Sequence, residues 1–122
     1  MRTPIAVLAL VAALLVPAFA GAGPASAATF KACSGSFAPD GTPGGGFYSR
    51  IKAKRITCTT ARSVTRAWVK RMASGSTNPT TRVTVLGYSC RGRSVSSPGD
   101  PNGGLSVLCT RDLKAVSFYG HP

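Results

Sequence analysis

Residues 57–74, TCTTARSVTRAWVKRMAS, decide the fold of this chain. Apolar and small side chains recur here every three or four positions, which is the period of one helix face. The stripe comprises Cys58, Ala61, Val64, Trp68 and Met72. A hydroxyl of Thr57 or Thr59 can cap the first turn, and Gly75 can end the last one. The stretch therefore predicts an amphipathic helix that buries Trp68 in a core.

A row of basic residues lies away from this stripe. Arg62, Arg66 and Lys70 follow one another at intervals of four, and Arg71 stands in the last turn. Like charges at this spacing cost a helix a few tenths of a kcal/mol per pair. No acidic residue of the stretch offsets them. The row is therefore a candidate contact for an anionic partner.

Residues 47–54 alternate in character, which predicts a half-buried β-strand. One set of alternate positions holds Phe47, Ser49, Ile51 and Ala53, and the other holds Tyr48, Arg50, Lys52 and Lys54. The second set, with Arg55 at the strand end, predicts a basic outer face. On this interpretation the ring of Tyr48 is exposed and free to stack on a ligand.

Further strands are predicted by runs of β-branched and alternating residues, at 29–33, 80–90, 105–110 and 115–119. Two segments dense in glycine, with proline and aspartate, are predicted loops, at 34–46 and 91–104. The order is two strands, one helix and three strands. We therefore expect an α+β fold in which one amphipathic helix packs on a small antiparallel sheet of four to five strands.

The first 27 residues have the parts of a secretory signal peptide. Arg2 supplies the positive start, residues 5–16 are an unbroken apolar run of twelve, and Ala25-Ser26-Ala27 is a cleavage site, with a second one at residues 18–20. The run is shorter than the roughly 20 residues that span a bilayer. Residues 28–122 are therefore predicted to form a single secreted domain, extracellular or wall-associated, without a transmembrane anchor.

Four cysteines follow the cleavage site: Cys33, Cys58, Cys90 and Cys109. An even number in a small exported domain indicates two disulfides. Cys90 and Cys109 end two predicted strands that a hairpin would bring together, which favours Cys90–Cys109 with Cys33–Cys58. Pairing of Cys58 with Cys90 or Cys109 stays open as the alternative. Because the spacings contain no C-x-x-C element, no metal site is predicted.

Several short motifs follow one another along the chain, each occurring once. They are residues 56–64 (ITCTTARSV), Trp68, residues 87–90 (GYSC), residues 107–109 (VLC) and residues 116–118 (VSF). This pattern resembles that of a broad group of small secreted actinobacterial proteins. The resemblance spans about residues 51–118 and implies a shared structural framework, but no particular activity. Residues 107–112, VLCTRD, also resemble a stretch of the secreted subtilisin-inhibitor family, whose remaining cysteine layout is missing here.

Acid–base residues are scarce, so we expect no enzyme activity and no cofactor. The chain has one histidine, His121, next to its last residue, and no glutamate. Its acidic residues are Asp40, Asp100 and Asp112, of which the first two stand in Gly–Pro loops typical of turn formation. Catalysis needs acids, bases or nucleophiles within reach of one another.

Residues 28–122 carry 14 basic and three acidic side chains, a net charge of +11. Such an excess attracts polyanions. The candidate anion-binding residues are Arg50, Lys52, Lys54, Arg55, Arg62, Arg66, Lys70 and Arg71.

We therefore expect a non-enzymatic domain that binds an anionic polymer or acidic protein at the cell envelope, without sequence-specific readout of nucleic acid. The alternatives are a cationic antimicrobial effector and a secreted inhibitor of proteases or other enzymes that presents a loop such as residues 91–104. The sequence carries no signal for an oligomeric state.

Overall fold

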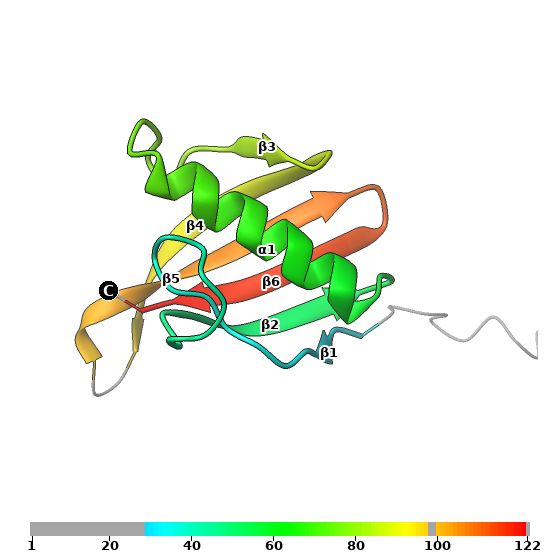
Figure 1. Cartoon of the computed structure of the whole chain (residues 1–122), viewed down its shortest axis with the longest axis horizontal. Helices are drawn as coiled ribbons and strands as arrows, with labels where there is room; N and C mark the ends of the chain where they lie inside the picture. Colours follow the sequence, from blue (N-terminus) through cyan, green and yellow to red (C-terminus); the bar gives the residue numbers. More distant parts are fainter. Residues whose placement is uncertain (1–28, 98–99, 122) are drawn as a thin grey trace, which may run out of the picture.

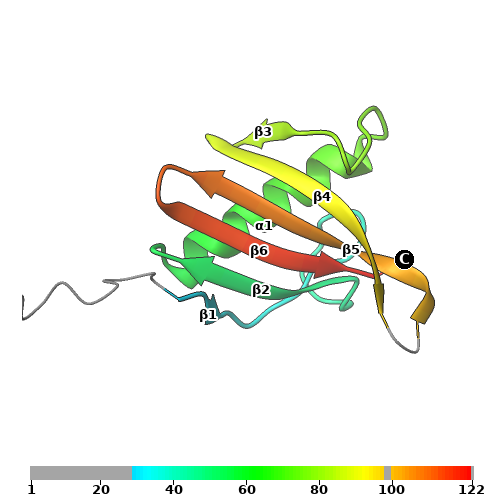
Figure 2. The same cartoon turned by 180° about the vertical axis from the view of Figure 1, so that it is seen from behind.

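The computed structural model describes residues 29–97 and 100–121. Within these residues, one helix lies across one face of a six-stranded antiparallel sheet, and no described helix covers the other face (Figures 1 and 2). The predicted signal peptide, residues 1–27, lies outside the described residues. Within the described part, no helix combines the length and hydropathy needed to cross a bilayer.

The elements in chain order are β1 (Lys31–Ala32), β2 (Tyr48–Lys54), α1 (Cys58–Ala73), β3 (Val83–Val85), β4 (Tyr88–Ser97), β5 (Asp100–Arg111) and β6 (Lys114–Gly120). The strand order in the sheet is β1-β2-β6-β5-β4-β3, and every neighbouring pair is antiparallel. The α+β class with one helix on an antiparallel sheet is confirmed. The expected four to five strands were too few.

The additional strand arises because the predicted strand at 80–90 is a hairpin. Leu86 and Gly87 both have positive φ, 48° and 79°, and form the two-residue turn between β3 and β4. Successive left-handed residues are the signature of a type I′ turn, whose twist matches that of the flanking strands. The Leu-Gly pair lacks the Asn or Asp that usually marks this turn.

The predicted loop at 91–104 was also wrong, because most of it belongs to β4 and β5. Its glycines allow close packing within the sheet. A Cβ at Gly92 would come within 2.5 Å of the Pro79 carbonyl oxygen, and one at Gly104 would overlap the Tyr119 ring. The segment is therefore a paired hairpin for most of its length.

Helix α1 begins and ends as its sequence predicts. The Thr57 hydroxyl accepts a hydrogen bond from the Thr60 N–H at 3.2 Å. Gly75, with a φ of 80°, donates its N–H to the Met72 carbonyl at 3.1 Å and terminates the helix. The helix buries five side chains against the sheet: Ala61, Val64, Thr65, Trp68 and Val69.

Trp68 is fully buried, as predicted, and makes edge-on contacts with the rings of Phe118 and Tyr48 at 5.3 and 5.8 Å. The predicted exposure of Tyr48 was wrong, because this side chain is only 9% exposed. A β-bulge interrupts β2 between Ser49 and Lys52, and Arg50 there has a φ of 54°. The extra residue reverses the strand's phase, so Tyr48 and Ile51 both face the helix.

Two disulfides are present, in the pairing favoured from the sequence. Cys33–Cys58 joins the segment after β1 to the first residue of α1. Cys90–Cys109 joins directly opposite residues of β4 and β5. Loops of this length give about 3 kcal/mol of stabilisation per bridge. The first bridge fastens the helix, and the second lies within the sheet itself.

Candidate anion-binding faces

The helix-free side of the sheet carries its side chains in cross-strand rows, since residues directly opposite one another share a face. The central row runs over β2, β6, β5 and β4 as Lys52, Ser117, Leu108 and Arg91. The row on one side of it comprises Lys54, Ala115, Thr110 and Ser89, and the row on the other side comprises Ser49, Tyr119, Ser106 and Arg93. Cations thus stand mainly at the row ends, while the middle is neutral.

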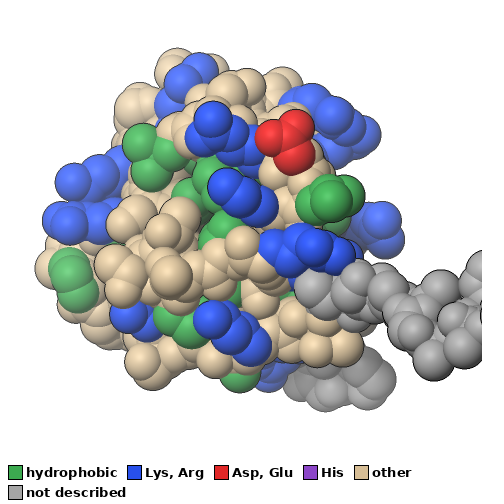
Figure 3. All heavy atoms as spheres, turned by 90° about the vertical axis from the view of Figure 1, so that its right-hand side faces the viewer, with side chains coloured by type: hydrophobic (Ala, Val, Ile, Leu, Met, Phe, Trp, Pro, Cys, Tyr) green, Lys and Arg blue, Asp and Glu red, His purple; other side chains and the backbone are tan. Residues whose placement is uncertain are grey.

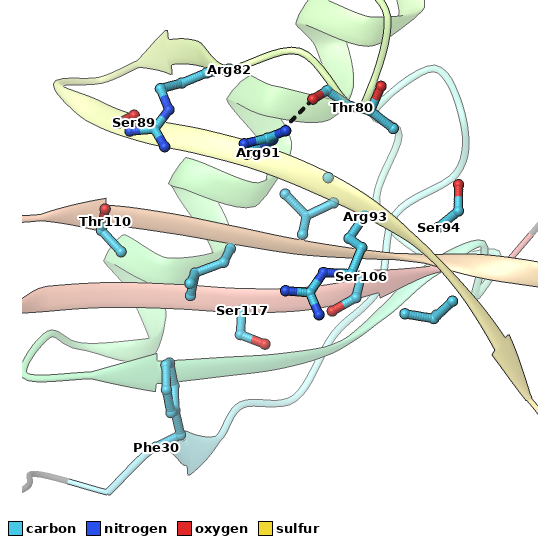
Figure 4. Close-up of a pocket in the computed structure, with 14 residues that line it drawn as sticks. Phe30, Thr80, Arg82, Ser89, Arg91, Arg93, Ser94, Ser106, Thr110 and Ser117 are labelled. Atoms are coloured by element: carbon cyan, nitrogen blue, oxygen red, sulfur yellow. Dashed lines mark hydrogen bonds between the residues drawn. The ribbon is translucent and has the colours of Figure 1, made fainter.

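An open depression of about 910 Å³ lies over β4, β5 and β6 on this side. Its floor includes the hydroxyl residues Ser106, Thr110 and Ser117, together with Leu108, which is 48% exposed. One edge of the depression is lined by Arg91 and Arg93 of β4 and by Arg82, which precedes β3 (Figure 4). The opposite edge is lined by Phe30, which precedes β1. The strand spacing puts the backbones of Lys52 and Arg91 about 14 Å apart.

We call Lys52, Lys54, Arg82, Arg91 and Arg93 the sheet face. The Arg91 Nε donates to the Thr80 carbonyl oxygen at 3.3 Å, which fixes the guanidinium at the rim of the depression (Figure 4). The Lys54 Nζ lies 5.8 Å from the centre of the Phe30 ring. A guanidinium has five N–H donors, so Arg91 can hold this contact and still donate to a ligand.

A further cation, Arg50, lies beside the sheet face. Its guanidinium carbon is 5.1 Å from the centre of the Tyr119 ring, in a cation–π contact. Tyr119 occupies the outer row between Ser49 and Ser106. The bulge that turned Tyr48 inward therefore leaves Arg50 next to the helix-free side of the sheet.

No described carboxylate lines the depression. The acidic side chains that the structure describes are Asp40, in a turn before β2, and Asp112, in the β5–β6 turn. The end of the molecule that faces the viewer in Figure 3 shows many Lys and Arg side chains and very little acidic surface. The positive potential of the sheet face is thus not neutralised by a neighbouring described acid.

The structure divides the predicted anion-binding residues between two sides of the molecule. Lys52 and Lys54 lie on the helix-free side of the sheet. Arg62, Arg66 and Lys70, which we call the helix face, lie on α1 at positions outside its buried stripe. Arg55 directly follows β2 and has a φ of 58°, and Arg71 is in the last turn of α1. The eight predicted residues therefore do not form one surface.

The helix face borders the loop that precedes β2. The Arg62 Nη1 donates to the Ser34 carbonyl oxygen at 3.3 Å, and the aliphatic part of Lys70 packs beside Gly41. A second depression, of about 450 Å³, lies between this loop and α1, and Arg62 and Arg66 are among its lining residues. Arg66 and Lys70 are exposed.

Sequence reasoning missed three residues of the sheet face: Arg82, Arg91 and Arg93. A signal for two of them was present, because from Tyr88 onward the apolar or small residues Tyr88, Cys90 and Gly92 alternate with Ser89, Arg91 and Arg93. The glycines of this segment obscured that alternation. Arg82 precedes a strand of only three residues, which is too short to show a period.

Two further polar groups outside these faces have structural partners. Asp40 accepts the Thr42 N–H at 2.9 Å, and the hydrogen bonds from Thr42 lower the pKa of this exposed carboxyl below its usual 3.8. The His121 N–H donates to the Phe47 carbonyl at 2.8 Å. In the described part of the chain there is no free cysteine and no cluster of three potential metal ligands. What the two faces offer chemically is positive charge and N–H and O–H donors.

Comparison with known proteins adds no relative, because no protein-family model, curated protein or solved structure matches this chain.

Proposed function

We propose that this protein is an exported, non-enzymatic domain that binds a linear anionic polymer of the cell envelope through its sheet face. The observation that carries the proposal is the arrangement of the rows. Lys52 and Arg91 stand at the two ends of a row whose middle residues, Ser117 and Leu108, carry no charge. The cations form two banks: Lys52 and Lys54 on β2, and the three arginines on β4 and just before β3. A polymer lying between the two banks meets positive charge on both sides and hydroxyl groups below.

Charge-assisted hydrogen bonds are the strongest contacts that such a surface can form. An exposed guanidinium or ammonium loses little hydration when it meets an exposed phosphate or carboxylate, and the release of counterions drives the association. The two disulfides are compatible with an oxidising, extracellular environment. Export would bring the domain to the envelope polymers, where its net charge favours encounter.

Binding of fluorescent long-chain inorganic polyphosphate, followed by anisotropy at several salt concentrations, tests the proposal. The logarithm of the binding constant should fall linearly with the logarithm of the salt concentration, by about 0.7 for each cation that contacts the polymer. If all five sheet-face cations make contact, the slope is about 3.5. The variant Lys52→Gln/Arg93→Gln removes a cation from each bank without touching the Arg91–Thr80 bond. We expect it to weaken binding and reduce the slope by about 1.4.

The matched control is Arg111→Gln/Lys114→Gln, which removes the same charge at the β5–β6 turn, away from the depression. It should leave the slope nearly unchanged. Equal losses in the two variants would mean that net charge alone drives binding, which would overturn the proposal. Tight binding of polyglutamate with none of polyphosphate would point to an acidic protein as the partner instead.

A further inference from the structure

Two basic faces lie on opposite sides of this small domain. The sheet face lies on one side of the sheet, and the helix that carries Arg62, Arg66 and Lys70 lies against the other (Figures 1 and 2). Packed layers of secondary structure are about 10 Å apart, and the charged groups extend outward from both layers. That separation exceeds the Debye length of about 8 Å at physiological salt. The two faces therefore act as separate electrostatic sites.

The helix face has the form of a row. Arg62, Arg66 and Lys70 are four residues apart, which places successive cations about 6 Å apart along the helix axis. The first turn of α1 contains no acidic residue. The nearby Asp40 carboxylate accepts its hydrogen bond from the Thr42 N–H. Solvent ions or an anionic ligand can therefore relieve the repulsion that remains within the row.

A single extended stretch of polymer cannot lie on both faces, because the sheet and the helix stand between them. We infer that one molecule of this protein binds two polymer strands at once, one on each face, and so cross-bridges linear polyanions. This inference rests on the proposed binding of polymer by the sheet face. It adds a consequence that one face alone would not have, namely that the protein assembles anionic polymers into a network.

The test uses the intact secreted domain and two batches of long-chain polyphosphate that carry different fluorophores. Fluorescence cross-correlation reports whether chains of both colours move together. We expect strong cross-correlation at substoichiometric protein and none without protein. Excess tripolyphosphate, which is too short to connect two protein molecules, should abolish it by occupying both faces.

The decisive variant is Arg66→Gln/Lys70→Gln, which removes two exposed cations from the helix face and leaves the Arg62–Ser34 contact in place. It should retain at least half of the polymer affinity but lose most of the cross-correlation. The control Arg111→Gln/Lys114→Gln carries the same net charge and should continue to bridge. Glutamine keeps much of each side-chain stem, so the variant should fold, which a thermal melt verifies.

The possible results separate the inference from the proposed function. If wild type binds each polymer but the two colours never move together, each domain engages one chain and the inference is overturned, while polymer binding by the sheet face stands. If the helix-face variant bridges as well as wild type, bridging has another origin, such as self-association, and the inference is again overturned. If neither polymer binds, the proposed function itself fails.

Discussion

The sheet face and the helix face carry the same kind of charge in different physical settings. On the sheet face, strand register sets the position of every cation except Arg82, which precedes β3. A cation–π contact holds Lys54, and a hydrogen bond holds Arg91. On the helix face, the cations stand in one row and repel one another. The sheet face is therefore a shaped site with a neutral middle, while the helix face is a line of charge. The number of basic residues alone therefore does not describe a binding surface.

The largest effect on stability is expected from removing the disulfides, because one fastens the helix and the other lies within the sheet. Cys90 and Cys109 are fully buried within the sheet, whereas Cys33 and Cys58 are partly exposed. Replacing either pair by alanine loses about 3 kcal/mol of chain-entropy stabilisation. Loss of the buried sulfur atoms of Cys90→Ala/Cys109→Ala adds a cavity cost of about 1 kcal/mol. Urea denaturation at equilibrium should therefore show the larger loss for this pair.

A larger destabilisation in Cys33→Ala/Cys58→Ala would mean that attachment of the helix start contributes more than the sheet bridge. It would contradict the expectation that loss of the buried bridge within the sheet is the more costly of the two. Folded Cys90→Ala/Cys109→Ala protein should also bind polyphosphate less tightly, because the lost bridge joins two strands that carry the sheet face and its depression. Arg91 and Arg93 are on β4, and Leu108 of the depression is on β5.

A substitution on the helix face is expected to change the free energy of unfolding less, and to raise it rather than lower it. Arg66→Gln removes the middle charge of the row and both of its i, i+4 repulsions with Arg62 and Lys70. The free energy of unfolding should rise by a few tenths of a kcal/mol at low salt, and the gain should shrink as salt screens the row. Thermal melts at low and high ionic strength measure this difference. A decrease in stability at low salt would show that Arg66 makes a stabilising contact in the folded protein.

The helix was predictable from its sequence because all the features that indicate it lie within the helical segment itself. Its apolar stripe, capping threonine and terminal glycine all lie within about 20 consecutive residues, and each acts locally. The disulfide pairing followed from the expectation that a hairpin brings Cys90 and Cys109 together. The predicted basic row of Arg62, Arg66 and Lys70 likewise required only helical periodicity.

The sheet face was less predictable because long-range pairing decides it. The bulge at Arg50 inverts the phase of β2, and nothing in its alternating pattern marks that position. Gly92 and Gly104 indicate loops by local rules, yet they allow the close approach of Pro79 and Tyr119. The row from Lys52 to Arg91 depends on the register of four strands, three of which lie far along the chain from β2.

An NMR titration of the ¹⁵N-labelled domain with tripolyphosphate shows residue by residue whether the sheet face binds anions. We expect the largest chemical-shift changes at low ligand concentration at the depression, in the backbone amides of Arg91, Arg93, Leu108 and Ser117. Amides of the helix face should respond at higher ligand concentration. Shift changes confined to other regions, or no changes at millimolar tripolyphosphate in low salt, would mean that the sheet face is not an anion-binding site.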